Sequence, residues 1–147
     1  MNAEGRRQKA EGRVQSAELS MPSTRFLAAV PQFTVDHLVF TAEYYRDVLG
    51  FRLEGYWMDP PVFAIVARDD VEVFFNQATE PVVRSRRAGY DMFLRLDGVD
   101  ALAEELQARG ANIIDPPEDR IYGQRELVVE DCNGLILCFG EAISVAR

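Results

Sequence analysis

The sequence predicts an α+β fold made of two successive βαβββ modules. Its length of 147 residues suits one domain with one core. The order of one strand, one helix and three strands occurs twice, in halves of about 55 residues each. Within each half, alternating apolar positions indicate strands, whereas apolar positions spaced by three and four residues indicate a helix. A plain α+β sandwich without internal symmetry would give a similar pattern and is the alternative.

The first module is predicted at residues 26–78. Residues 26–35 have the alternation of a strand, with Phe33 and Val35 on one face. A helix follows, and its apolar stripe consists of Leu38, Ala42, Tyr45 and Leu49. Gly50 is well placed to end this helix in a left-handed conformation. Three more strands are predicted at residues 51–58, 62–68 and 71–77, with turns at residues 59–61 and 69–70.

The second module is predicted at residues 90–142, after a polar linker at residues 79–89. It begins with a strand at residues 90–96. A helical stripe of Val99, Leu102 and Leu106 follows, and Gly110 closes this helix. Short strands are predicted at residues 112–114, 125–130 and 135–139, with turns at Asp115-Pro116-Pro117 and Asn133-Gly134.

Residues 1–24 are predicted to be a disordered tail, and residues 25–147 to be the single domain. The tail is polar, lacks aromatic residues and has no convincing strand period. No apolar run approaches the roughly 20 residues that span a bilayer, and the amino terminus lacks the apolar stretch of a secretory signal. A cytoplasmic protein without membrane contact is therefore expected, and Cys132 and Cys138 are expected to be reduced thiols.

The net charge of −8 at pH 7 narrows the classes of partner. An acidic surface repels phosphate backbones, so no nucleic-acid partner is expected. The same surface attracts cationic small molecules, although solubility alone also explains it.

Three segments resemble the vicinal oxygen chelate superfamily, the glyoxalase, bleomycin-resistance and dioxygenase proteins. EYYRDVLGF at residues 43–51 is similar to its helix-to-strand signature, and EDCNGLILCF at residues 130–139 to its terminal hairpin. YDMFLRLDGVDAL at residues 90–102 resembles the start of its second module. The resemblance covers residues 26–141 and implies a curved mixed sheet around a cavity, with the helices outside.

The alternation of side chains along the predicted strands separates a helix face from a cavity face. The helix face is expected to consist of Phe33, Val35, Val71, Val73, Phe75, Met92, Leu94 and Leu96. The residues that alternate with this helix face, together with residues on adjacent strands, are expected to line the ligand-binding cavity that the resemblance implies. They are Gln32, Thr34, Trp57, Phe63, Glu72, Phe74, Asn76, Asp91, Phe93, Arg95 and Cys138. For each aromatic ring taken singly, ordinary core packing is the alternative.

The resemblance also implies where a metal ion would bind. Metal-dependent relatives hold a divalent ion with four side chains, and the matching positions here are Val30, Glu72, Asp91 and Cys138. Only Glu72 fits that pattern, because valine has no ligand atom and a neutral thiol is a poor substitute for a carboxylate. No cofactor is therefore expected, and Glu72 and Asp91 remain as candidates for a loosely held divalent ion.

Three functions follow from this reasoning. The resemblance is nearest the metal-free bleomycin-resistance branch, which implies a homodimer that binds a small hydrophobic or cationic compound without changing it. The alternative is a divalent-metal-dependent lyase or isomerase of the glyoxalase type, and a third is an accessory module without a ligand. No catalytic residue is identified: the sole histidine, His37, follows the first strand, where a surface or capping role is expected. A surface ion pair is expected for Arg125, with a ligand carboxylate as the alternative partner.

Overall fold

The computed structural model describes residues 23–85 and 88–144. It contains two four-stranded mixed sheets and two helices, in the order strand, helix and three strands, repeated once. The predicted α+β fold of tandem βαβββ modules is therefore confirmed. Residues 1–22, which make up nearly all of the predicted tail, lie outside the described residues.

The first module forms one of the two sheets. Its elements are β1 (Gln32–Val35), α2 (Leu38–Asp47), β2 (Arg52–Trp57), β3 (Phe63–Arg68) and β4 (Val71–Gln77). The strand order is β1-β4-β3-β2, with β1 parallel to β4 and the other neighbours antiparallel. The parallel pairing requires a crossover after β1, and α2 begins that crossover.

The second module repeats this topology. Its elements are β5 (Met92–Arg95), α3 (Val99–Ala108), β6 (Asn112–Arg120), β7 (Gln124–Glu130) and β8 (Ile136–Ala142). The strand order is β5-β8-β7-β6, and β5 is parallel to β8. The first and last strands of each module are thus neighbours, which brings residues that are far apart in sequence onto one surface.

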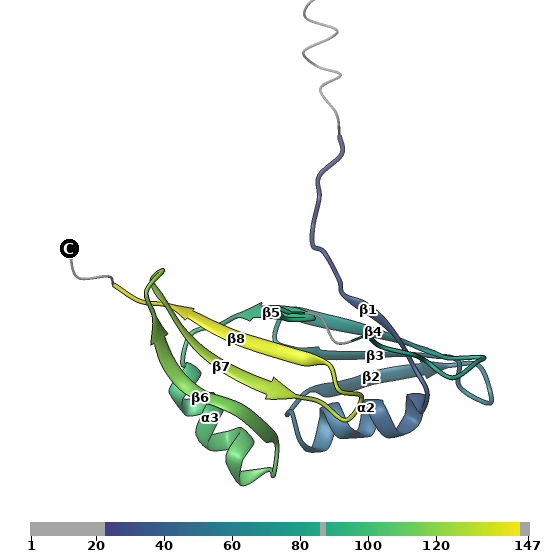
Figure 1. The fold of residues 1–147 in the computed structure, drawn as a ribbon. Coiled ribbons are helices and arrows are strands. Elements are labelled where there is room, and N and C mark those ends of the chain that lie inside the picture. The colour runs from purple at the N-terminus through teal and green to yellow at the C-terminus, as the bar shows by residue number, and fades with distance from the viewer. Residues whose placement is uncertain (1–22, 86–87, 145–147) are drawn as a thin grey trace, which may run out of the picture.

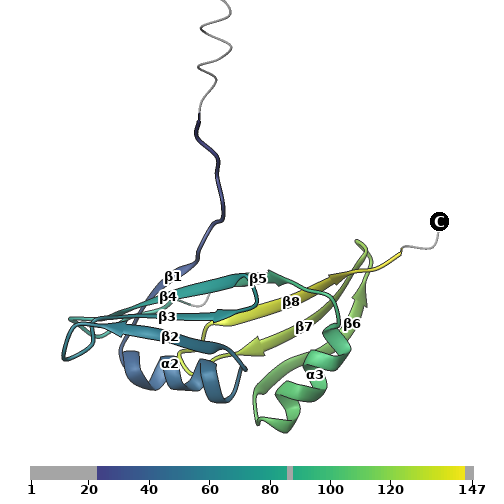
Figure 2. The ribbon, with the colours of Figure 1, turned by 180° about the vertical axis from the view of Figure 1, so that it is seen from behind.

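Both helices lie on the same side of the sheets, and no helix of the described chain covers the opposite face (Figures 1 and 2). We call this opposite face the open face. The core lies between the sheets and the helices and draws on both modules, with Val35, Tyr45, Phe75, Val99, Leu106, Leu127 and Leu137 among its fully buried members. The predicted helix face is largely correct, but Val71 at the start of β4 is 38% exposed.

Polar side chains also join the two modules. The hydroxyl of Tyr45 in α2 donates a hydrogen bond of 2.6 Å to Asp131 Oδ2, in the turn between β7 and β8. The guanidinium of Arg68 on β3 makes two hydrogen bonds, of 2.7 and 2.8 Å, to Glu105 on α3. Asn133 donates to Thr41 at 3.1 Å. The helix side of the molecule is therefore tied together across the modules.

Two predicted strands differ most in length from the observed ones. Residues 26–31 have no regular structure, and β1 begins only at Gln32, with Phe26 and Leu27 95% and 83% exposed. The turn predicted at Asp115-Pro116-Pro117 lies inside β6, which continues to Arg120. Prolines are tolerated there because β6 is an edge strand, where the missing N–H groups cost no ladder bonds, and the register shifts around them.

Within the described ranges, neither helix has the length and the apolar composition that crossing a membrane requires.

Candidate functional site

The predicted cavity residues of the first module share the open face. Thr34 on β1 is paired with Asn76 on β4, which is paired with Phe63 on β3 and through it with Trp57 on β2. Directly paired residues on neighbouring strands point to the same side of a sheet. Two residues earlier on both strands, Gln32 is paired with Phe74. Glu72 lies a further two residues before Phe74 on β4. These positions alternate with the buried core residues Val73 and Phe75.

Three aromatic side chains form a continuous row across this face. The ring centroids of Trp57 and Phe63 are 5.4 Å apart, and those of Phe63 and Phe74 are 5.3 Å apart, with edge-to-face geometry at both contacts. Trp57 is 46% exposed, whereas Phe63 and Phe74 are partly buried. The row therefore presents one half-exposed indole and two partly buried rings to solvent.

The remaining predicted cavity residues lie on the second sheet. Phe93 on β5 is paired with Cys138 on β8, and Arg95 is paired with Gly140. Phe93 is 44% exposed, whereas Cys138 is fully buried. Across the described residues, no hydrogen bond or aromatic contact joins these side chains to the row on the first sheet. The predicted site therefore consists of two groups, one on each sheet.

The arrangement of acidic and sulfur side chains does not fit the metal site that the resemblance implies. Asp91 Oδ2 accepts a hydrogen bond of 2.8 Å from the backbone N–H of Ile136, which occupies one of its two oxygens. Glu72 is exposed on β4, and Val30 has no ligand atom. In residues 23–85 and 88–144, no three His, Cys, Asp or Glu side chains are grouped closely enough to hold an ion. Glu72 and Asp91 thus remain without a third ligand in the described chain.

The environment of Cys138 favours the neutral thiol over the thiolate. Burial, followed by the negative charge of Glu126, raises the pKa of Cys138 to about 12. The thiolate is the nucleophilic and metal-binding form, and it is absent near neutral pH at such a pKa. Cys138 is therefore a small wall residue of the second sheet. Cys132 is also free, as expected.

Glu126, a charged residue on the open-face side of β7, is not among the site residues predicted from the sequence. Its side chain is fully buried on β7, next to Leu127, Val128 and Val129. It is paired with Gly140 on β8, so it shares a face with Cys138 two residues away. The sequence does contain a signal for Glu126. It is a carboxylate within an apolar strand, at a position that alternates with the core residues Leu127 and Val129.

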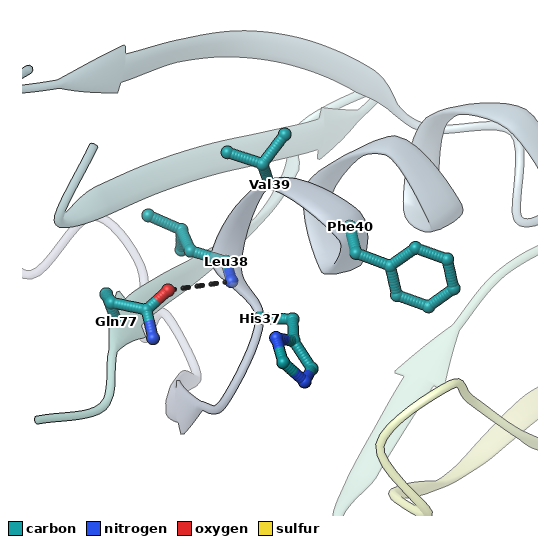
Figure 3. Close-up of a pocket in the computed structure, with 5 residues that line it drawn as sticks. All are labelled: His37, Leu38, Val39, Phe40 and Gln77. Atoms are coloured by element: carbon teal, nitrogen blue, oxygen red, sulfur yellow. Dashed lines mark hydrogen bonds between the residues drawn. The ribbon is translucent and has the colours of Figure 1, made fainter. Parts of the chain in front are cut away.

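His37 lies away from the open face, in a surface hollow at the start of α2 (Figure 3). The hollow has a volume of about 630 Å³ and is lined by His37, Leu38, Val39, Phe40 and Gln77. His37 occupies the N-cap position but makes no capping hydrogen bond with its side chain. Gln77 caps the helix instead, because its Oε1 accepts a hydrogen bond of 3.0 Å from the N–H of Leu38. The expected surface position of His37 is correct, and the capping role belongs to Gln77.

Arg125 makes the expected surface ion pairs. Its guanidinium contacts Asp100 at 3.0 Å and Asp119 at 2.8 Å. Arg125 is adjacent to Glu126 on β7, so its side chain projects to the opposite side of the sheet. It is therefore not a part of the open face.

Comparisons with known proteins agree with this architecture. No curated protein matches the chain significantly in sequence. The structure of TioX from Micromonospora sp. ML1 is similar with a TM-score of 0.66 and 21% identity, over 80% of this chain and 100% of that one. A glyoxalase/bleomycin resistance protein/dioxygenase from Nocardioides has a TM-score of 0.66 and 18% identity, over 92% of this chain and 96% of that one.

A third similar structure is a bleomycin resistance determinant encoded on the transposon Tn5. It has a TM-score of 0.65 and 20% identity, over 80% of this chain and 98% of that one. At these identities the likeness concerns the fold. The family described as the Glyoxalase/Bleomycin resistance protein/Dioxygenase superfamily matches residues 28–139, which is most of the chain. With its tandem βαβββ modules and this match, the chain belongs to the glyoxalase/bleomycin resistance protein/dioxygenase superfamily.

Proposed function

We propose that this protein binds a small hydrophobic or cationic compound on the open face of its sheets, without a metal ion and without transforming the compound. The observation that carries the proposal is the row of Trp57, Phe63 and Phe74, whose outermost ring is 46% exposed. Large exposed rings in contact with one another are a common feature of ligand-binding surfaces. The nearby carboxylate of Glu72 and the net charge of −8 favour a cationic ligand over an anionic one.

Titration with planar aromatic compounds tests this proposal. Bleomycin-type and acridinium-type cations, together with neutral aromatics of similar size, are titrated by calorimetry and by the fluorescence of Trp57, which is the sole tryptophan. Saturable binding is expected, and Trp57→Ala is expected to weaken it by about tenfold through the lost stacking surface. Phe40→Ala is the matched control, since Phe40 is 60% exposed on α2, away from the open face. Absence of binding across the whole series would overturn the proposal.

The alternative, a divalent-metal-dependent lyase or isomerase of the glyoxalase type, makes a different prediction. It requires the purified protein to contain near-stoichiometric nickel, zinc, manganese or iron. It also requires that metal to be lost in Glu72→Ala, because Glu72 alone matches the family's ligand pattern. Metal analysis with that result would replace the proposal of a metal-independent binder.

We also propose that the protein acts as a cytoplasmic homodimer. The segment at residues 23–31 leaves β1 and extends away from the domain on the side of the open face (Figure 1). Phe26 and Leu27 on this segment are 95% and 83% exposed. A second copy supplies apolar surface for both side chains, and light scattering should give the mass of a dimer. Replacing both with serine should shift the protein towards monomer, whereas Phe40→Ser should not. A monomeric parent protein would refute the dimer.

A further inference from the structure

The second sheet buries one carboxylate on the open face. Glu126 is 0% exposed, although the charged form of a carboxylate loses much hydration free energy on burial. Its neighbours Leu127 and Val129 point to the core, so Glu126 points to the other side. The side chain is therefore placed under the surface at which the protein meets solvent or a ligand.

Two tyrosine hydroxyls contact this carboxylate, and the ring of Phe93 lies beside one of these tyrosines. The hydroxyl of Tyr122, in the turn between β6 and β7, donates to both oxygens of Glu126, at 2.8 Å to Oε2 and more closely to Oε1. The hydroxyl of Tyr90 lies 3.5 Å from Oε1. The ring centroids of Tyr90 and Phe93 are 6.5 Å apart. All three rings are 44–60% exposed, so they form a cover whose outer side meets solvent, with the carboxylate fully buried beneath it.

Gly140 allows this cover to lie close to the sheet. A Cβ atom at Gly140 would approach the Phe93 ring carbons Cζ and Cε1 to 2.5 and 2.9 Å. Because Gly140 is paired with Glu126 on β7, the place of its missing side chain lies beside the carboxylate, and that place is taken by the Phe93 ring and, at 3.3 Å, by Gln124 Oε1. A fully buried carboxylate thus lies beneath aromatic rings that are themselves open to solvent.

The charges around Glu126 do not balance. Arg120 Nε lies 3.6 Å from Glu126 Oε1, which is too far for a good hydrogen bond. The same guanidinium also contacts Glu118 at 3.1 Å and Asp115 at 3.8 Å. One positive charge is therefore shared among three carboxylates, and the cluster attracts a further cation.

We propose that Tyr90, Phe93, Tyr122 and Glu126 form a binding site for the cationic end of the ligand, an alkylammonium or alkylguanidinium group. We call these four residues the Glu126 cage. Aromatic faces and a carboxylate together bind such cations. Arg120 is the internal competitor, because its guanidinium occupies the electrostatic position that the ligand takes. This inference rests on the proposed small-molecule binding and assigns the ligand's charged group to the second sheet.

Two substitutions of opposite charge give the decisive test. Arg120→Gln removes the competing cation and is expected to tighten the binding of butylammonium and butylguanidinium by about tenfold. Glu126→Gln removes the anion and is expected to weaken it by at least about tenfold. A purely structural ion pair predicts that both substitutions impair the protein in the same direction. Affinities are measured by calorimetry on the full chain, with neutral butanol as the uncharged probe.

Two residues on the same strand provide matched controls. Arg125→Gln makes the same charge change as Arg120→Gln, but Arg125 pairs with Asp100 and Asp119 on the other side of the sheet. Glu130→Gln makes the same change as Glu126→Gln near the far end of β7. Both controls are expected to alter the affinity for butylammonium by less than about twofold, because Arg125 projects to the other side of the sheet and Glu130 lies four residues from Glu126 along β7.

Tyr122→Phe keeps the inference testable if Glu126→Gln does not fold. It retains the exposed ring and removes the hydroxyl that competes for the carboxylate, so equal or tighter binding of butylammonium is expected. Weaker binding in this variant, or an unchanged affinity in Arg120→Gln, would overturn the inference.

The position of the bound probe separates this inference from the broader proposal. Nuclear magnetic resonance is expected to show butylammonium shifting the amide signals of Gly123 and Gly140, beside the Glu126 cage. If planar aromatics perturb the Trp57 indole but alkylammonium ions leave both glycines unchanged, the inference fails and the proposed function stands. If alkylammonium ions bind at the glycines and no aromatic compound binds, the aromatic row is refuted as the ligand surface.

Discussion

Replacing Tyr45 with phenylalanine tests how the two modules are held together. Tyr45 is 0% exposed and Asp131 is 6% exposed, so water cannot readily substitute for their 2.6 Å hydrogen bond. Asp131 Oδ1 keeps its hydrogen bonds from the N–H groups of Asn133 and Leu135, both at 2.8 Å. Tyr45→Phe therefore removes one charge-assisted bond and leaves Oδ2 buried without that donor.

The expected cost is about 2 kcal/mol in the free energy of unfolding, within the range for hydrogen bonds to charged groups. For a chain of this size, that corresponds to a fall of about 4–8 °C in the unfolding temperature. Urea denaturation followed by circular dichroism measures the cost. Tyr44→Phe is the matched control, because the Tyr44 hydroxyl makes no side-chain hydrogen bond to the described residues and should change stability by less than about 0.5 kcal/mol.

The cost should also depend on pH in a defined direction. Burial raises the pKa of Asp131, and the hydrogen bond from Tyr45 opposes part of that increase. A carboxyl whose pKa is raised by folding favours the folded state most at low pH, and this contribution is lost as the pH rises through the folded pKa. Tyr45→Phe raises that pKa further, so its cost should shrink as the pH falls from about 8 to about 4. A cost below about 0.5 kcal/mol at neutral pH, or one that grows on acidification, would refute the reasoning.

Three other outcomes are expected. Tyr56→Phe should be neutral or should stabilise the protein by up to about 1 kcal/mol in urea denaturation, because the Tyr56 hydroxyl is buried without a hydrogen-bond partner among the described residues; a clear loss would contradict this. Gly50→Ala should cost about 1–3 kcal/mol, since Gly50 has a φ of 75° and a Cβ there would lie 2.6 Å from Arg68 Nη1; an unchanged midpoint would count against it. Burial is the largest cause of the pKa shift at both thiols, and it raises the pKa of Cys132 to about 11 and that of Cys138 to about 12. Mass spectrometry at about pH 8 should therefore find little alkylation by iodoacetamide until the protein is unfolded. Rapid labelling of the native protein would show that this shielding is absent.

The sequence predicted well those features that depend on neighbouring residues. The alternation along β4 places Val73 and Phe75 in the core and Phe74 on the open face, as expected from a repeat of two. The apolar stripe ending at Gly50 identified the first helix, because helix periodicity and the left-handed stop are both local. The predictions failed where the pairing of strands determines how far a strand extends. Residues 115–117 contain two prolines and still continue a strand, because β6 is the edge strand of its sheet.

By itself the sequence determined the α+β class, the two modules and the face to which most strand residues point, because these features follow from short-range periodicity. Only the tertiary structure decided the surroundings of Glu126. Its cover consists of Tyr122 from a hairpin turn, Tyr90 from the segment before β5 and the Phe93 ring, which lies against Gly140 on β8. Strand pairing brings these residues together across long sequence separations, and the local pattern of β7 carries no information about the partners that cover its carboxylate.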